Sequence, residues 1–229
     1  MSAEHGTTPP GEPRRGPRDE QGSAPDRPDR PAAEDFPPAP WDLCGQGWLT
    51  VWTAPRSAVP PSPPGVVPLT LFGRVLVVTA FVDYRPPGLL SYHELLAAVV
   101  VRKGVSPGLS ITHIWVDDET SRRGARAMWA IPKQPADFTF DAGHLTARTH
   151  ATAEEAPLKA PGLPARITTS VWQARNGTAH RTALRTSARV RPTRLRWHLP
   201  GTGGIGWLTA ARPRLHLAVT NLRMRFGEP

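Results

Sequence analysis

The sequence of 229 residues contains little lysine, one cysteine and no long uninterrupted apolar run. Among its 28 basic residues, the lysines are Lys103, Lys133 and Lys159, and all the others are arginines. Cys44 has no partner for an internal disulfide, and a single cysteine cannot give the paired spacing of a zinc site. These absences favour the reducing cytoplasm as the compartment of the protein.

Further absences narrow the class of protein. The longest apolar run, residues 66–82, is interrupted by Pro68 and Arg74 and is too short to span a bilayer comfortably. The N-terminal segment lacks the apolar core of a signal peptide. The eight histidines show no H-E-x-x-H spacing, and no G-x-S-x-G sequence is present. We therefore expect no membrane partner, no metal and no cofactor.

Residues 1–40 differ in composition from the rest of the chain. They contain ten prolines, eight acidic and five basic residues, with almost no large apolar side chains. Such a segment buries too little surface to offset its ordering entropy, so we expect a disordered Pro-rich tail. Residues 41–229 are expected to form a single domain.

The charge is concentrated in that domain. The whole chain carries +9 and the tail −3, so residues 41–229 carry +12. A basic surface of this size is compatible with a nucleic-acid partner. The arginines are nevertheless scattered along the whole domain, which disfavours nucleic acid and is equally compatible with oligomerisation or an anionic substrate.

Turn residues separate many short apolar segments, which predicts a mainly β protein. A helix is expected from Asp117 or Asp118, which can cap its start, to Ile131, because Pro132 cannot continue it. Asn176-Gly177 is typical of a type I′ hairpin turn. Strands are predicted over residues 48–52, 67–82, 92–102, 109–116, 138–140, 145–149, 167–173, 180–188, 195–199 and 215–225. The fold class is therefore mainly β (α+β), with an antiparallel sheet and few helices.

One apparent cofactor motif lacks its context. Residues 201–206 satisfy G-x-G-x-x-G, but Pro200 precedes them and Pro213 cuts short any following helix. A dinucleotide site needs a strand before this motif and a helix after it. We interpret the segment as a turn.

Lys133 is the first candidate catalytic residue. It ends the apolar stretch Trp129–Lys133, directly after Pro132. An arginine cannot lose its proton near neutral pH, whereas a lysine in an apolar setting can act as an amine nucleophile. The alternative is an ordinary lysine on a surface loop.

Glu94 is the second candidate, because it places a carboxylate at the start of an apolar strand. The same position is compatible with a glutamate at the edge of a strand that faces solvent. Both readings stay open on the local sequence alone.

Taken together, these segments resemble the acetoacetate decarboxylase family. Residues 116–119, Arg126 and Trp129–Lys133 follow the family's D-x-E … G-R-E-x-x-x-x-P-K pattern without a gap. Gly88 and the later Tyr92-His93-Glu94 match its glycine followed by Y-x-E. The resemblance covers roughly residues 45–229 and is specific between residues 84 and 140.

The resemblance implies a closed, barrel-like antiparallel sheet, a homo-oligomer and a small keto-acid substrate. It also implies that Lys133 forms a Schiff base and that Glu94 lies in the active site, orienting the substrate or moving protons. In this chemistry the protonated imine accepts the electrons released by decarboxylation of a β-keto acid. The lysine must be neutral, so its pKa must fall from about 10.4. Trp129, Ile131 and Phe138 are expected to form an apolar wall around it, and Arg126 to contact the substrate.

The chain departs from the family at two predicted substrate contacts. Gln134 stands where the decarboxylases have a second lysine, a neighbouring cation that is established there as lowering the pKa of the nucleophile. Gln46 is aligned with the family's carboxylate-binding arginine. Desolvation would then have to lower the pKa of Lys133. Two alternatives remain: an aldolase or dehydratase that acts on a 2-oxo acid through the same lysine, and a non-catalytic module that binds a small ligand.

Overall fold

The computed structural model describes residues 35–227, so most of the predicted tail lies outside the described residues. Phe36 packs against apolar residues of the domain. The indole Nε1 of Trp41 donates a hydrogen bond of 2.9 Å to the carbonyl of Pro37. Packing against the domain therefore begins a few residues before the predicted boundary at residue 41.

The described residues are mostly β-strand. The helical elements are α1 (Glu119–Trp129) and the short 3₁₀ turns η1 (Arg56–Ala58) and η2 (Gly206–Ala210). The strands are β1 (Trp41–Ala54), β2 (Val67–Pro68), β3 (Thr70–Leu71), β4 (Arg74–Tyr84), β5 (Tyr92–Lys103), β6 (Ser106–Val116), β7 (Lys133–Pro135), β8 (Phe138–Asp141), β9 (His144–Ala147), β10 (Ala151–Pro157), β11 (Leu163–Arg175), β12 (Thr178–His198) and β13 (Arg212–Phe226). No helix within residues 35–227 is long and apolar enough to cross a membrane.

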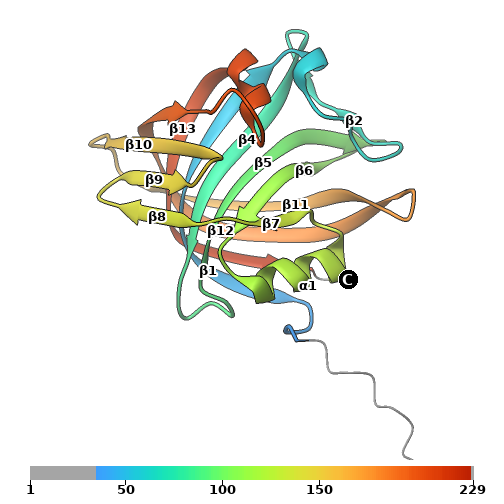
Figure 1. Cartoon of the computed structure of the whole chain (residues 1–229), viewed down its shortest axis with the longest axis horizontal. Helices are drawn as coiled ribbons and strands as arrows, with labels where there is room; N and C mark the ends of the chain where they lie inside the picture. The colour runs from blue at the N-terminus through green and yellow to red at the C-terminus, as the bar shows by residue number, and fades with distance from the viewer. Residues whose placement is uncertain (1–34, 228–229) are drawn as a thin grey trace, which may run out of the picture. The chain divides into compact units, whose positions relative to one another are not determined.

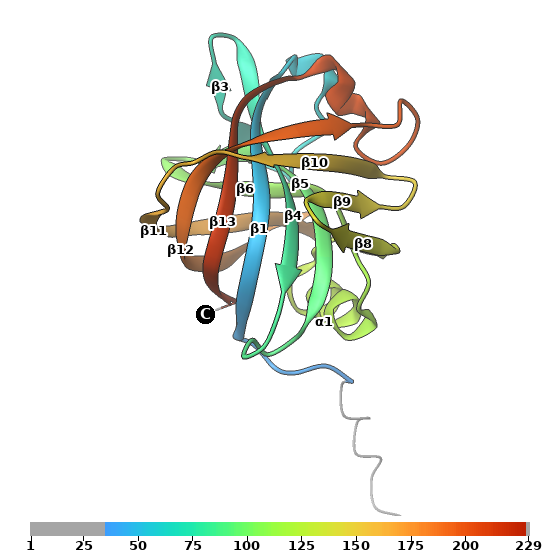
Figure 2. The same ribbon diagram turned by 90° about the vertical axis from the view of Figure 1, so that its left-hand side faces the viewer.

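Within the described region, a closed ring of strands forms the frame of the domain (Figures 1 and 2). The order β11-β6-β5-β4-β1-β13-β12 returns to its start because β12 also pairs with β11. The pairs of this ring are antiparallel except that β11 meets β6 in parallel, through Val171 and Leu109. The expected barrel-like, mainly antiparallel sheet is confirmed.

The side chains on the two faces of the ring belong to two different hydrophobic clusters. On β4, Ala80, Val82 and Tyr84 belong to one cluster, whereas Val77 and Phe81 belong to the other. This division follows the alternation of side chains along a strand. The first cluster takes side chains from all strands of the ring and therefore fills its interior. The second lies on the outer face, beneath β8–β10, which extend the sheet from β12, and beneath η2.

Helix α1 packs against the interior cluster through small residues. Asp118 caps its start, since its side chain accepts a hydrogen bond of 2.5 Å from the Ser121 backbone N–H. Gly124 lets the helix approach Trp41, because a Cβ at this position would lie 2.6 Å from the indole ring. Ala130 ends the helix in the left-handed conformation, with φ of 55°.

The structure corrects several predicted elements. The segments 180–188 and 195–199 belong to one continuous strand, β12. The segment 67–82 is divided by a turn at Phe72-Gly73, where both residues have positive φ. β10 was not predicted at all. Asn176 and Gly177 both have positive φ, as a type I′ turn requires, and the glycine-rich segment is a turn leading into η2.

Candidate active site

The turn after α1 carries Lys133 into the interior of the ring. Ile131 and Pro132 follow the left-handed Ala130. Lys133 then begins β7, which pairs in parallel with β6 opposite Ile114. The Arg126 guanidinium donates a hydrogen bond of 3.0 Å to the Lys133 carbonyl, which ties the turn back to the helix. The Lys133 side chain is buried, so the surface-loop alternative is excluded.

Three acceptors surround the Lys133 amine. Its Nζ lies 2.9 Å from Oε2 of Glu94, 2.7 Å from Oγ of Ser121 and 3.1 Å from Oη of Tyr92. A lysine ammonium has three N–H donors, so each donor has one acceptor. Nζ also lies 4.7 Å from the centre of the Tyr92 ring, within range of a cation–π contact.

Glu94 faces the ring interior rather than solvent. Its side chain and that of Lys133 are each 5 % exposed. The Tyr84 hydroxyl donates a hydrogen bond of 3.4 Å to its second oxygen, Oε1. The strand-edge interpretation of this carboxylate is therefore excluded.

The ionisation of Lys133 differs from the expectation. Burial lowers the pKa of Lys133, but the attraction of Glu94 and the contact with Tyr92 outweigh it and raise the pKa above its usual 10.5. Burial raises the pKa of Tyr92 to about 12, so this phenol is protonated near neutral pH. Burial and Glu94 likewise raise the pKa of Tyr84. The resting amine is therefore an ammonium paired with a carboxylate, and a neutral nucleophile requires proton transfer to Glu94.

A cavity of about 90 Å³ lies beside this cluster, inside the ring. Trp129 and Ile131 line it as expected. Its polar lining residues are Tyr84, Tyr92, Glu94 and Lys133. The other lining residues are apolar: Trp41, Leu43, Leu96, Ala98, Leu109, Ile111, Ile114, Ala125, Trp129, Ile131, Val171, Leu184, Met224 and Phe226. The hollow is therefore an apolar chamber with a single polar end.

Other predicted substrate contacts lie outside this cavity. Gln134 is exposed, because adjacent residues of a strand point to opposite faces and Lys133 points inward. Arg126 is on the exposed side of α1 and reaches the Lys133 backbone, not the cavity. Phe138 packs against the outer cluster and not beside Lys133.

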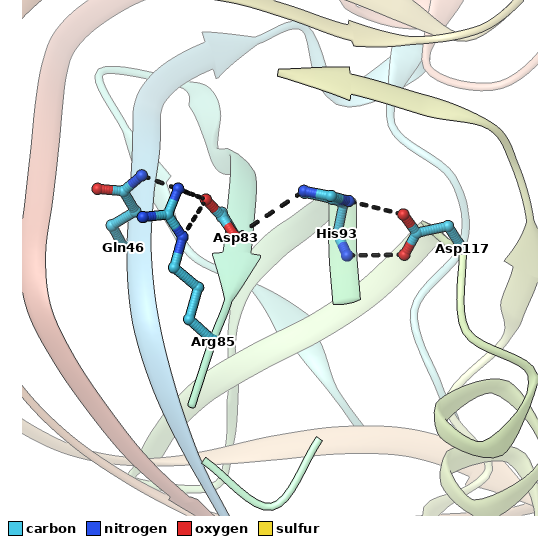
Figure 3. A network of polar contacts seen from close by, with 5 residues as sticks. All are labelled: Gln46, Asp83, Arg85, His93 and Asp117. Carbon is cyan, nitrogen blue, oxygen red and sulfur yellow. Dashed lines mark hydrogen bonds and ion pairs between the residues drawn. The ribbon is translucent and has the colours of Figure 1, made fainter. Parts of the chain in front are cut away.

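Gln46 also lies away from the cavity, in a polar network on the outer face of the ring (Figure 3). Its amide donates a hydrogen bond of 3.2 Å to Asp83, which also pairs with Arg85 at 2.5 Å. Asp83 lies 3.8 Å from His93 Nε2. Gln46 thus contacts a carboxylate of the protein itself.

The same network also holds β5 and the start of α1 together next to the site. Asp117 accepts hydrogen bonds from the His93 backbone N–H at 2.7 Å and contacts the His93 ring at 2.6 Å. His93 lies between Tyr92 and Glu94 on β5, and Asp117 directly precedes the cap of α1. The contact therefore holds both acceptors on β5 in position relative to Ser121 on the helix.

The sequence interpretation did not identify Ser121 or Tyr84 as site residues. Ser121, Ala125 and Trp129 recur every four residues, which is the spacing of the buried face of α1. A polar residue in that stripe, three positions after the cap, was the signal available for Ser121. Tyr84 has no comparable signal. Within residues 35–227, no group of His, Cys, Asp and Glu side chains is arranged to hold a metal ion.

Comparison with known proteins agrees with this geometry. The family model described as acetoacetate decarboxylase matches residues 55–158, a range that contains Glu94, Ser121 and Lys133. The predicted resemblance to the acetoacetate decarboxylase family is confirmed over these residues. No curated protein matches the sequence.

Solved structures share the fold at low sequence identity. Acetoacetate decarboxylase from Legionella pneumophila is 15 % identical, with a TM-score of 0.61 over 88 % of this chain and 90 % of that one. Another acetoacetate decarboxylase structure is 18 % identical, with a TM-score of 0.54 over 84 % and 88 %. The enduracididine biosynthesis enzyme MppR, complexed with pyruvate, is 16 % identical, with a TM-score of 0.57 over 87 % and 93 %. The family fold thus includes a decarboxylase and a pyruvate-binding biosynthetic enzyme.

Proposed function

We propose that this protein is a carbon–carbon lyase that forms a Schiff base between Lys133 and a small carbonyl substrate. The observation that carries the proposal is the buried contact of 2.9 Å between Lys133 and Glu94 at the polar end of an apolar cavity. A buried amine that touches a carboxylate has a proton acceptor within hydrogen-bond distance, and an apolar cavity lies beside it.

Imine formation begins with transfer of a proton from the Lys133 ammonium to Glu94. The neutral amine then attacks the carbonyl carbon of the substrate, while the Tyr92 hydroxyl is close enough to donate to the carbonyl oxygen. The Glu94 carboxylic acid protonates the hydroxyl of the resulting carbinolamine, which leaves as water. Glu94 returns to the carboxylate and the substrate is held as a protonated imine.

Bond cleavage uses the protonated imine as the electron acceptor. The electrons of the breaking carbon–carbon bond enter the imine and give a neutral enamine. Protonation of the enamine carbon and hydrolysis by water then release the product and restore the ammonium. The hydrogen bond from Lys133 to Ser121 orients the amine during these steps.

Two reactions of keto acids proceed through the same kind of lysine imine. Decarboxylation of acetoacetate or a related β-keto acid is the reaction of the decarboxylases in the family. Aldol or dehydratase chemistry on a 2-oxo acid is the second, and the pyruvate complex of MppR is the observation that favours it. Release of carbon dioxide distinguishes the first from the second.

Exchange of the carbonyl oxygen of a ketone with ¹⁸O-labelled water tests the imine step. Each cycle of imine formation and hydrolysis replaces that oxygen, so the wild-type protein should accelerate labelling of a small ketone. The double variant Lys133→Met/Glu94→Gln keeps the cavity free of net charge and should show only the uncatalysed rate. Equal labelling by the two proteins would refute the proposal and favour a binding module.

A further inference from the structure

The side chains that line the cavity carry no net charge. Among the described residues that line it, Lys133 is the single cation and Glu94 is the single anion. They neutralise each other at 2.9 Å. The two tyrosines that complete the polar end have raised pKa values and are uncharged near neutral pH.

A keto acid would bring an uncompensated negative charge into this chamber. The three N–H groups of Lys133 already have acceptors, and imine formation consumes the amine. The nearest arginine on α1, Arg126, is bound to the backbone of Lys133 and does not line the cavity. A carboxylate in an apolar cavity loses its hydration, and without a cation or hydrogen-bond donor nothing compensates that cost. Glu94 would also repel it.

The cavity is small, so it can bury few substrate atoms beyond the reacting group. A water molecule needs roughly 10–15 Å³ of such space, so a volume of about 90 Å³ accommodates about six to nine non-hydrogen atoms. A substrate of that size has no remote group whose binding offsets the burial of a carboxylate. The atoms next to its carbonyl must therefore be compatible with apolar walls.

We infer that the Schiff base at Lys133 serves a small neutral β-hydroxy ketone or aldehyde with an alkyl body, cleaved by a retro-aldol reaction, and not a keto acid. The inference rests on the proposed lysine imine and specifies its substrate. The apolar residues hold the alkyl part, and the polar end holds the carbonyl and the hydroxyl.

The cleavage requires no reactant other than water. In the protonated imine, the Glu94 carboxylate takes the proton of the β-hydroxyl group. The bond between the α and β carbons breaks, the β carbon leaves as an aldehyde, and the electron pair enters the imine to give the enamine. The Glu94 acid then protonates the α carbon, and water hydrolyses the imine to a ketone and the Lys133 ammonium. The net charge of the chamber returns to zero after each step.

Two substrates with the same number of non-hydrogen atoms provide the test. Acetoacetate yields acetone and carbon dioxide, and 4-hydroxypentan-2-one yields acetone and acetaldehyde, so release of acetone measures both. With wild-type protein, kcat/KM for the hydroxy ketone should exceed that for acetoacetate at least tenfold, with acetaldehyde in equal amount to acetone. The Lys133→Met/Glu94→Gln variant supplies the background rate for each substrate.

A variant of the wall tests the electrostatic cause. Met224 is half-buried, lines the cavity and lies 3.8 Å from the Tyr84 hydroxyl. Met224→Lys should shift the ratio of the two kcat/KM values toward acetoacetate, whereas Met224→Gln, similar in size but neutral, should not.

Borohydride trapping separates the possible failures. Trapping or turnover that favours acetoacetate in the wild-type protein would overturn the neutral-substrate inference and leave the lysine imine intact. A Lys133 adduct with the hydroxy ketone but no acetaldehyde would overturn the retro-aldol step. Absence of an adduct with either compound would overturn both the inference and the proposed function.

Discussion

Lys133 Nζ lies 2.9 Å from Glu94 Oε2, and both side chains are almost completely buried inside the ring of strands. These two residues come from different elements: Lys133 begins β7 and Glu94 lies near the start of β5. The pair joins the helix turn to the central sheet and supplies both the amine and its proton acceptor. Stability and reactivity therefore depend on the same contact.

Replacing Lys133 should destabilise the fold, because it leaves the Glu94 carboxylate buried without a partner. We expect Lys133→Met to lower the free energy of unfolding by about 3–5 kcal/mol at neutral pH. The double variant Lys133→Met/Glu94→Gln should recover most of this loss. Denaturant titration measures both, with Lys159→Met, at an exposed position, as a control that changes stability by less than about 0.5 kcal/mol. A single variant as stable as wild type would contradict the buried pair.

Replacing Glu94 should shift the pH dependence of the Lys133 amine. The pKa of Lys133 is raised above 10.5 by Glu94, so in wild type the neutral amine increases as the pH rises through the alkaline range. Glu94→Gln removes the attraction and leaves the burial that lowers the pKa, so the neutral amine should appear at lower pH. Turnover should nevertheless fall by about 10²–10⁴-fold, because the proton acceptor is lost.

Reductive methylation followed by peptide mass spectrometry measures this shift. The exposed Lys103 in the same sample serves as an internal reference. If the Lys133 profile in Glu94→Gln moved to higher pH, or did not move, Glu94 would not control the ionisation of the amine.

Replacing Ser121 should slow the imine step without changing its pH dependence. Ser121→Ala removes an uncharged acceptor 2.7 Å from Nζ, so the amine loses orientation but keeps its ion pair. We expect ¹⁸O exchange to slow about tenfold, equivalent to about 1.4 kcal/mol. The neighbouring Thr120→Ala is the matched control and should exchange at the wild-type rate. A shift of the pH profile in Ser121→Ala would instead indicate that the hydroxyl takes part in proton transfer.

Substituting Gly124 should destabilise the wall of the cavity. A Cβ in Gly124→Ala would lie 2.6 Å from Trp41, so the helix must move or the indole must shift. We expect a loss of about 1–3 kcal/mol in denaturant titration. At an open helical position the same change would instead stabilise the protein by about 0.5–1 kcal/mol, and that result would contradict the close packing of α1.

Lys133 and Glu94 could be identified as a pair from the sequence, but the residues around them could not. The motif around Pro132 and Lys133 and the Y-x-E at Glu94 predicted two residues that the fold brings into contact, although they are far apart in the chain. Gln134 and Arg126 do not line the cavity. A motif records neighbours in sequence, whereas a strand and a helix point adjacent side chains in different directions. Gln46 does not line the cavity for a related reason, because its side chain lies on the outer face of β1.

Local patterns located most strands, but not the closure of the ring. The pairing of β12 with both β11 and β13 joins segments whose alternation of arginine and apolar residues reads as separate short strands. Closure depends on non-local hydrogen bonds, which no window of sequence contains. The homo-oligomer, the cytoplasmic location and the disordered tail remain predictions.

The central claim is that the Lys133 amine condenses with a carbonyl compound. Its most direct test is borohydride reduction of wild-type protein in the presence of a small ketone, followed by mass spectrometry of the proteolytic peptides. The adduct should be found on the peptide containing Lys133, and the peptides of Lys103 and Lys159 should remain largely unmodified. Modification spread equally over the three lysines, or absent from Lys133, would contradict the account.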